Sequence, residues 1–128
     1  MTNNNFSTKN TTKGKLPSLS FVSIKEAVLG KKYELSLVFI GDKLSRRLNK
    51  TYRSKDNPTN ILSFPLSETE GEMFINLNKV KKEAPSFDRN YSNFLLFLFI
   101  HGLFHLKGLQ HGSKMEVAEK KIRKRFKV

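Results

Sequence analysis

The three histidines of this chain all lie within one short segment, HGLFHLKGLQH, at His101, His105 and His111. Residues four apart on an α-helix share one face, so the imidazoles of His101 and His105 can point at a common centre. Gly108 is expected to end the helix, and the following turn would bring His111 back as a third ligand. Three neutral imidazoles bind Zn²⁺ readily and leave a fourth tetrahedral position for water. The segment therefore predicts a site for one Zn²⁺ ion.

Two other interpretations of this segment have to be weighed. In the first, one histidine packs in the core and two cap helix ends. In the second, the spacing H-x-x-x-H-x-x-G-x-x-H is that of the metzincin peptidases, whose general base is a glutamate directly after the first histidine. Here that position is Gly102. The sequence thus favours a metal site and argues against the peptidase mechanism.

The composition is that of one small globular domain without disulfides. The chain has 128 residues, of which 38% are hydrophobic and none is cysteine. This length suits a single hydrophobic core. The lack of cysteine excludes a disulfide framework and a cysteine nucleophile, and it fits a reducing cytoplasm. Residues 1–15 are rich in Asn, Thr and Lys, so we expect a disordered N-terminal arm followed by a single metal-binding domain over residues 16–128.

The chain is strongly basic. Its 24 Lys and Arg residues and 11 Asp and Glu residues give a formal net charge of +13. Such a surface attracts polyanions, above all nucleic acid, although a lysine-rich proteome would produce the same excess. The C-terminal segment KKIRKRFKV (120–128) is either a helix face that contacts RNA phosphates or a solubilising tail.

Nothing in the sequence resembles a signal peptide or a membrane span. The polar residues 1–15 contain no apolar stretch of the kind that signal peptides need. The longest unbroken apolar run, Phe94–Ile100, is far shorter than the roughly 20 residues of a membrane-spanning helix. We therefore expect a soluble, cytoplasmic protein with no membrane partner.

Hydrophobic periodicity and turn residues predict five helices and three strands. The expected helices cover 18–30, 42–52, 78–84, 91–107 and 114–126, and the expected strands cover 33–40, 60–65 and 72–77. Asp42 and Ser113 are the expected N-caps of the second and last helices, and Gly30 and Gly108 should end two others. The last two strands are joined by a short turn and should pair antiparallel. Helices and strands do not alternate regularly, so the fold class is α+β with a small sheet.

Four segments of the chain resemble the YbeY family of bacterial endoribonucleases, which act in ribosomal RNA maturation. YRSKDNPTNILSFP (52–65) is similar to the family's Y-R-x-K-D-x-P-T-[ND]-V-L-S-F-P segment, and GEMFINLNKVKKEA (71–84) to its G-D-I-x-I-C-x-x-x-A-x-x-E-A stretch. HGLFHLKGLQH (101–111) resembles H-[GS]-x-L-H-L-x-G-[YF]-D-H, and MEVAEKKI (115–122) resembles the M-E-x-x-E helix that follows. The likeness extends over residues 33–126.

The resemblance implies an α+β domain with a small mixed sheet flanked by helices, in which a buried helix carries metal-binding histidines. It also implies that His101, His105 and His111 hold one Zn²⁺ ion. Arg53 matches the arginine that the family uses in catalysis or RNA binding. The implied partners are ribosomal RNA, the small ribosomal subunit and its assembly proteins. One departure lies before the third histidine, where Gln110 replaces an aspartate and is expected to lower ligand basicity and metal affinity.

Within this hypothesis, Arg53 and His101 have catalytic roles. A zinc ion held by three histidines lowers the pKa of bound water or polarises a phosphoryl oxygen, and Arg53 can bind phosphate through two hydrogen bonds. Lys55, Asn60 and Ser63 lie in the same matched segment. They are the further candidates for RNA binding, although ordinary turn and strand hydrogen bonding explains the last two equally well.

The sequence identifies no general base. Glu116 and Glu119 lie in the last helix and could serve only if that helix folded back over the histidines. We expect them instead to be helical surface charges paired with nearby lysines.

The leading hypothesis is a zinc-dependent, single-strand-specific endoribonuclease that acts in ribosomal RNA maturation, at the 3′ end of 16S rRNA, and in ribosome quality control. The first alternative is a non-catalytic ribosome-assembly factor that binds RNA and has a structural zinc. The second is a zinc peptidase, which Gly102 disfavours.

Overall fold

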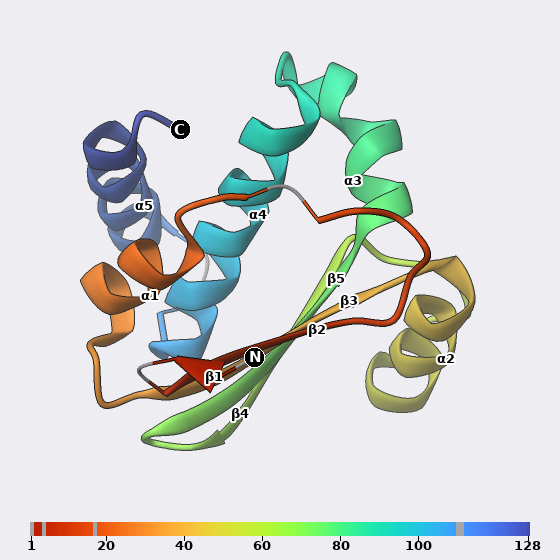
Figure 1. Cartoon of the computed structure of the whole chain (residues 1–128), viewed down its shortest axis with the longest axis horizontal. Helices are drawn as coiled ribbons and strands as arrows, with labels where there is room; N and C mark the ends of the chain where they lie inside the picture. Colours follow the sequence, from red (N-terminus) through yellow and green to blue (C-terminus); the bar gives the residue numbers. More distant parts are fainter. Residues whose placement is uncertain (1, 4, 17, 110–111) are drawn as a thin grey trace.

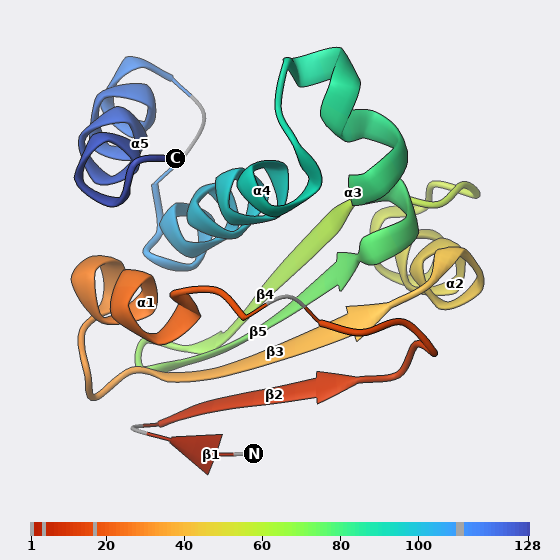
Figure 2. The same cartoon turned by 45° about the horizontal axis from the view of Figure 1, so that its top comes forward.

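The computed structural model describes residues 2–3, 5–16, 18–109 and 112–128. It is a small mixed α+β domain in which helices pack on a twisted sheet (Figure 1). Helices α1 and α4 cover one face of the sheet, and α5 packs against α4 from outside (Figure 2). The α+β class expected from the sequence is confirmed. None of the helices among the described residues has the length and apolar character needed to cross a bilayer.

The sheet is mixed, and its strand order is β1-β2-β3-β5-β4. The strands are β1 (Thr2–Asn3), β2 (Phe6–Asn10), β3 (Glu34–Ile40), β4 (Ile61–Ser67) and β5 (Glu70–Asn76). β3 pairs parallel with both β2 and β5, whereas β4 and β5 form the expected antiparallel hairpin. This order places β4 at one edge of the sheet, beside the helix that carries the histidines.

The expected disordered arm is wrong over Phe6–Asn10, because this segment forms strand β2. The strand runs parallel to β3 in the register Phe6 with Leu35 through Asn10 with Phe39. The Phe6 side chain is only 4% exposed and meets the edge of the Phe99 ring. The polar composition of this segment suggested disorder. The segment is ordered because it pairs with the edge of β3 and buries the Phe6 ring.

The helices agree closely with those expected. They are α1 (Phe21–Leu29), α2 (Asp42–Arg53), α3 (Leu77–Glu83), α4 (Tyr91–Leu106) and α5 (Ser113–Phe126), with a 3-10 turn, η1 (Ala84–Phe87), between α3 and α4. α1 ends at Gly30, whose φ of 90° suits a residue without a side chain. Gly108, with φ 96°, similarly follows the end of α4.

Several boundaries differ from the sequence expectation; α1, for example, begins at Phe21 and not at residue 18. The N-cap positions of α2 and α5 are Gly41 and Gly112, so Asp42 and Ser113 are the first residues inside their helices. Strand β4 continues through Pro65 to Ser67, with a register shift between these residues. Proline is tolerated there because β4 is an edge strand, whose outer N–H groups need no partner strand.

The core lies between α4 and one face of the sheet. Met73 and Ile75 of β5 project from this face and are fully buried, and most apolar residues of α4 are also buried. Phe74 of β5 projects to the other face, where it meets Phe64 of β4, and Phe64 in turn meets Tyr52 at the end of α2. The alternation of strand side chains thus separates the hydrophobic core from the aromatic cluster that supports α2.

Candidate functional site

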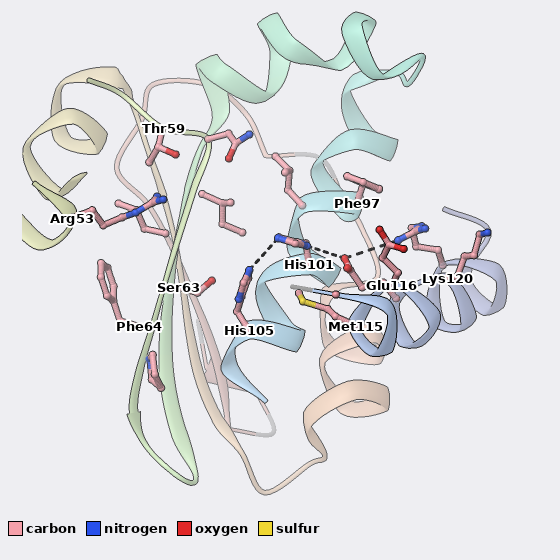
Figure 3. A pocket seen from close by; sticks show the side chains of 18 residues that line it. Arg53, Thr59, Ser63, Phe64, Phe97, His101, His105, Met115, Glu116 and Lys120 are labelled. Atoms are coloured by element: carbon pink, nitrogen blue, oxygen red, sulfur yellow. Dashed lines mark hydrogen bonds and ion pairs between the residues drawn. The ribbon is translucent and has the colours of Figure 1, made fainter. Parts of the chain in front are cut away.

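A cleft of about 1080 Å³ among the described residues separates strand β4 from helices α4 and α5. One side is formed by Arg53 and residues 59–65, and the other by Phe97, Leu98, His101 and His105 of α4 with Met115, Glu116, Glu119, Lys120 and Arg123 of α5. Figure 3 shows His101 and His105 between Arg53 and Ser63 on one side and Glu116 and Lys120 on the other. Two histidines predicted from spacing therefore lie in the cleft.

His101 and His105 point at each other across one turn of α4. Their Nε2 atoms are 3.0 Å apart, and their rings meet edge to face with centroids separated by 4.6 Å. Both side chains are partly exposed to the cleft. Helical spacing produces this convergence, as the sequence predicted.

The geometry of this pair fits a shared metal ion. Two nitrogen ligands of tetrahedral zinc, each about 2.0–2.1 Å from the metal, are about 3.3 Å apart. The observed separation of 3.0 Å between the Nε2 atoms is close to that value. With a small adjustment of either ring, the pair can present two lone pairs to one cation.

Glu119 of α5 is the partner of His101 on the side away from His105. Its Oε1 atom lies 3.0 Å from Nδ1 of His101, and the residue is only 6% exposed. An ionised carboxylate only accepts hydrogen bonds, so Nδ1 of His101 carries a proton, and Nε2 is the nitrogen turned toward His105. This is the tautomer that a metal-binding histidine needs, and such carboxylate partners also raise ligand basicity.

This position of Glu119 corrects the expectation that it is a surface charge. Its helix does fold back over the histidines, because Met115 is buried against the core and brings the first turns of α5 onto α4. Glu116, by contrast, is exposed as expected, although it lines the cleft. The match to M-E-x-x-E was the only sequence signal for Glu119.

His111, the predicted third ligand, and Gln110 lie outside the described residues. Within the described part of the chain, no group of three or more His, Asp or Glu side chains is arranged to hold a metal. A third protein ligand therefore remains a prediction from the sequence.

Gly102 allows α4 to lie directly against the sheet. A Cβ atom at this position would be 2.7 Å from Cε of Met73, 2.8 Å from Cδ1 of Ile61 and 2.9 Å from Oγ of Ser63. Carbon atoms do not approach so closely without displacement. The position at which metzincin peptidases have their catalytic glutamate thus faces packed strands β4 and β5, with no room for that side chain.

Arg53 is placed at the cleft by the way α2 ends. Ser54 adopts a left-handed conformation with φ 55°, and its N–H bonds to carbonyls of the last helical turn. The following loop is tied back to α2 by Ser45, whose Oγ donates to the carbonyl of Thr59 at 2.7 Å and accepts from its N–H at 2.8 Å. Asn49 adds a bond from Nδ2 to the carbonyl of Asn57 at 2.9 Å. These contacts fix the segment that enters β4.

The other candidate RNA-binding residues occupy different environments. Asn60 lines the cleft, but its Nδ2 donates to Oε1 of Glu83 at 2.9 Å. Ser63 lines the cleft on β4 opposite Gly102. Lys55 is exposed and is not one of the described residues that line the cleft. The structure thus places two of these three residues in the cleft that holds the histidines.

The opposite side of the cleft has two cations beside the carboxylates of Glu116 and Glu119. Lys120 and Arg123 come from the C-terminal basic cluster, and both line the cleft. The charge run was visible in the sequence, but it did not reveal which of its residues face the histidines. The packing of α5 on α4 decides which of these basic side chains face the histidines.

Comparisons with known proteins agree with this architecture. The family model described as Endoribonuclease YbeY matches residues 2–127. A protein named Endoribonuclease YbeY from Neorickettsia sennetsu is 38% identical over an alignment of 93 residues that covers 68% of this chain and 65% of the relative. One of the same name from Alkaliphilus metalliredigens is 36% identical over an alignment of 107 residues that covers 75% of this chain and 68% of the relative. The chain thus spans slightly less than two thirds of the first relative's length.

A solved structure shares the fold. The solution structure of TM1509 from Thermotoga maritima superposes with a TM-score of 0.64 at 24% sequence identity, covering 91% of this chain and 85% of that one. The family match extends over almost the whole sequence and includes the histidine segment and the segment that carries Arg53. The chain belongs to the Endoribonuclease YbeY family.

Proposed function

We propose that this protein is a zinc-dependent endoribonuclease that cleaves single-stranded RNA during ribosomal RNA maturation, including processing of the 3′ end of 16S rRNA, and in ribosome quality control. The observation that supports it best is the pair of Nε2 atoms of His101 and His105, 3.0 Å apart in a cleft with cations on both sides. The names of the relatives support the reaction class. The small ribosomal subunit and its assembly proteins are the proposed partners.

One Zn²⁺ ion would be held by His101, His105 and His111. Such an ion activates water at neutral pH and acts as a Lewis acid on phosphoryl oxygens. His101 is the better defined ligand, because Glu119 fixes its tautomer. His101 is therefore assigned a role in catalysis through its lone pair at Nε2.

Arg53 is proposed to bind the phosphate that is cleaved. Its guanidinium offers two parallel hydrogen bonds and a permanent charge, which offset the negative charge that builds up in the transition state. Ser63 lines the same side of the cleft and can donate a hydrogen bond to RNA. Asn60 can add its side-chain carbonyl, since its Nδ2 is engaged by Glu83. Lys55 contributes long-range attraction from outside the cleft.

Single-stranded RNA is the substrate that suits the cleft. Its flexible backbone can follow a groove between a strand and a helix, whereas specific recognition of a rigid duplex relies on its regular grooves. A peptide substrate is disfavoured because position 102 cannot hold a glutamate against Met73 and Ile61. The net charge of +13 also favours a polyanion.

The test compares His105→Ala, Arg53→Ala and a control, Arg47→Ala, which removes an exposed charge from α2. His105→Ala should abolish tight zinc binding and cleavage of single-stranded ribosomal RNA. Arg53→Ala should keep zinc but lower kcat/KM by about 10²–10³-fold, as for loss of one donor to transition-state charge. Arg47→Ala should behave like the wild type.

The alternatives give different results. Cleavage at the wild-type rate in both His105→Ala and Arg53→Ala would contradict the proposal. RNA binding that persists after zinc is removed, without cleavage by the wild type, would identify a binding factor with a structural metal instead. Peptide hydrolysis without RNA cleavage would identify a peptidase.

A further inference from the structure

Two arginines from distant parts of the chain converge on the ring of Phe97. Cζ of Arg89, in the segment before α4, is 4.3 Å from the ring centroid, and Cζ of Arg123, on α5, is 5.1 Å from it. Phe97 and Arg123 both line the cleft that holds the histidines, whereas Arg89 reaches the ring from outside the residues described as lining it. The ring thus brings together two guanidinium groups that are 34 positions apart in the sequence.

The ring and the first arginine are held by several contacts. Phe97 stacks on the fully buried Phe94 with an interplanar angle of 17° and a centroid separation of 5.9 Å. Nη1 of Arg89 donates a hydrogen bond to Oδ1 of Asn93. The side chain of Asn90 caps α4 by accepting from the Asn93 N–H at 2.8 Å. Arg89 is therefore oriented before any ligand arrives, which lowers the entropic cost of binding.

Arg89 is electrostatically disfavoured beside Arg123. Burial and, second, the positive charge of Arg123 lower the pKa of Arg89. The carboxylate next to Arg123 is Glu119, whose Oε1 is 3.9 Å from Nη1 of Arg123 and already accepts the hydrogen bond from His101. The charge of Lys120 lies in the same cleft wall. A polyanion placed between these cations would relieve their repulsion.

We propose that Arg89 and Arg123, brought together by the Phe97 ring, form a second phosphate-binding subsite for the RNA backbone, on the opposite side of the histidines from Arg53. Arginine is suited to this role because its planar fork binds phosphate oxygens in pairs while its face stacks on an aromatic ring. The identity of the polyanion rests on the proposed function.

The location of the subsite implies a path for the RNA strand. Figure 3 shows Arg53 on one side of His101 and Phe97 and Lys120 on the other. A strand bound by Arg53 at one phosphate and by the arginine pair at another would cross the histidines between these points. These two phosphate contacts, one on each side of the histidines, would hold the intervening phosphodiester in position.

The experiment measures binding of an oligouridylate to the metal-free protein in EDTA, over a series of salt concentrations. Arg89→Gln and Arg123→Gln should each weaken binding about tenfold, as expected for a lost charge-assisted hydrogen bond. Each should also make the slope of log Kd against log salt shallower by about 0.7, the value for one phosphate contact with a single strand. Lys81→Gln, an exposed residue of α3 with the same charge change, is the control and should change Kd less than twofold.

The double variant Arg89→Gln/Arg123→Gln should lose less binding free energy than the sum of the losses in the two single variants, because the arginines bind one phosphate together. If the Gln variants unfold, Arg89→Lys and Arg123→Lys take their place, because they keep the positive charge. Each should keep the salt slope but weaken binding, since lysine lacks the planar fork. Thermal unfolding of every variant identifies loss of fold.

Failure of this inference is distinguishable from failure of the proposed function. If the wild type cleaves RNA but the Gln and Lys variants bind as tightly and with the same slope as Lys81→Gln, the subsite is wrong and the nuclease stands. If the wild type never cleaves but binding depends on both arginines as described, the phosphate subsite stands and the nuclease does not.

Discussion

Oε1 of Glu119 lies 3.0 Å from Nδ1 of His101, although the two residues belong to different helices and are 18 positions apart. The bond joins α5 to α4 directly behind the Nε2 atom that faces His105. It leaves His101 with its proton on the far nitrogen and its lone pair toward the cleft. The last helix is thus part of the candidate metal site.

The first prediction concerns this bond. Glu119→Gln should lower zinc affinity about 10–100-fold, because a neutral amide still accepts the hydrogen bond but removes the negative charge that makes His101 a stronger ligand. Competition with a chromophoric chelator at constant pH measures the effect. Glu116→Gln is the matched control, since this exposed carboxylate lies on the same helix and the same cleft. Equal zinc affinities for the two variants would contradict the role assigned to Glu119.

The second prediction concerns the contact of Gly102 with the sheet. Gly102→Ala should lower the free energy of unfolding by about 1–2 kcal/mol, because overpacking against Met73, Ile61 and Ser63 outweighs the gain in helix propensity. Urea unfolding measures the change. Gly14→Ala, with only Oγ1 of Thr12 at 3.8 Å from the new methyl group, is the control. A Gly102→Ala variant that is more stable than the wild type would show that α4 can move off the strands without cost.

The third prediction concerns the loop that leads from Arg53 into β4. Ser45→Ala removes both hydrogen bonds to the backbone of Thr59 and leaves buried polar groups without this partner. The loss should be about 1–3 kcal/mol of unfolding free energy. It should also accelerate hydrogen exchange at the Thr59 N–H. Thr51→Ala, at an exposed position of the same helix, should change neither quantity appreciably. Unchanged exchange at Thr59 in Ser45→Ala would mean that other contacts hold the loop.

The fourth prediction concerns the pH dependence of stability. Hydrogen bonds from Asn76, chiefly, and from Asn78 lower the pKa of Asp42 below its ordinary value. A depressed carboxyl pKa stabilises the fold above the unfolded-state pKa, and this contribution is lost as pH falls through the folded-state value. The wild type should therefore be more stable than Asp42→Asn at neutral pH, and the difference should shrink below about pH 4.

Thermal unfolding at a series of pH values measures this difference. Glu68→Gln, in the exposed turn between β4 and β5, serves as the control and should show no comparable dependence. A stability difference between wild type and Asp42→Asn that grows on acidification would have the opposite sign and would contradict the assignment.

Local patterns in the sequence were sufficient for much of the fold. The apolar run before His101 predicted a buried helix, and the turn between β4 and β5 predicted their antiparallel pairing. These features depend on residues close together in the chain, where helical or strand periodicity and turn chemistry decide the structure. Strand β2 was missed because FSTKN has little apolar content of its own, and its order comes from pairing with β3.

The candidate site divides in the same way. The convergence of His101 and His105 followed from helical spacing alone, because residues four apart must share a face. The hydrogen bond between Glu119 and His101 and the meeting of Arg89 with Arg123 over Phe97 followed only from the packing of α5 on α4. No local periodicity encodes such contacts, because they join side chains that become neighbours only when burial of Met115 and the apolar residues of α4 brings the helices together.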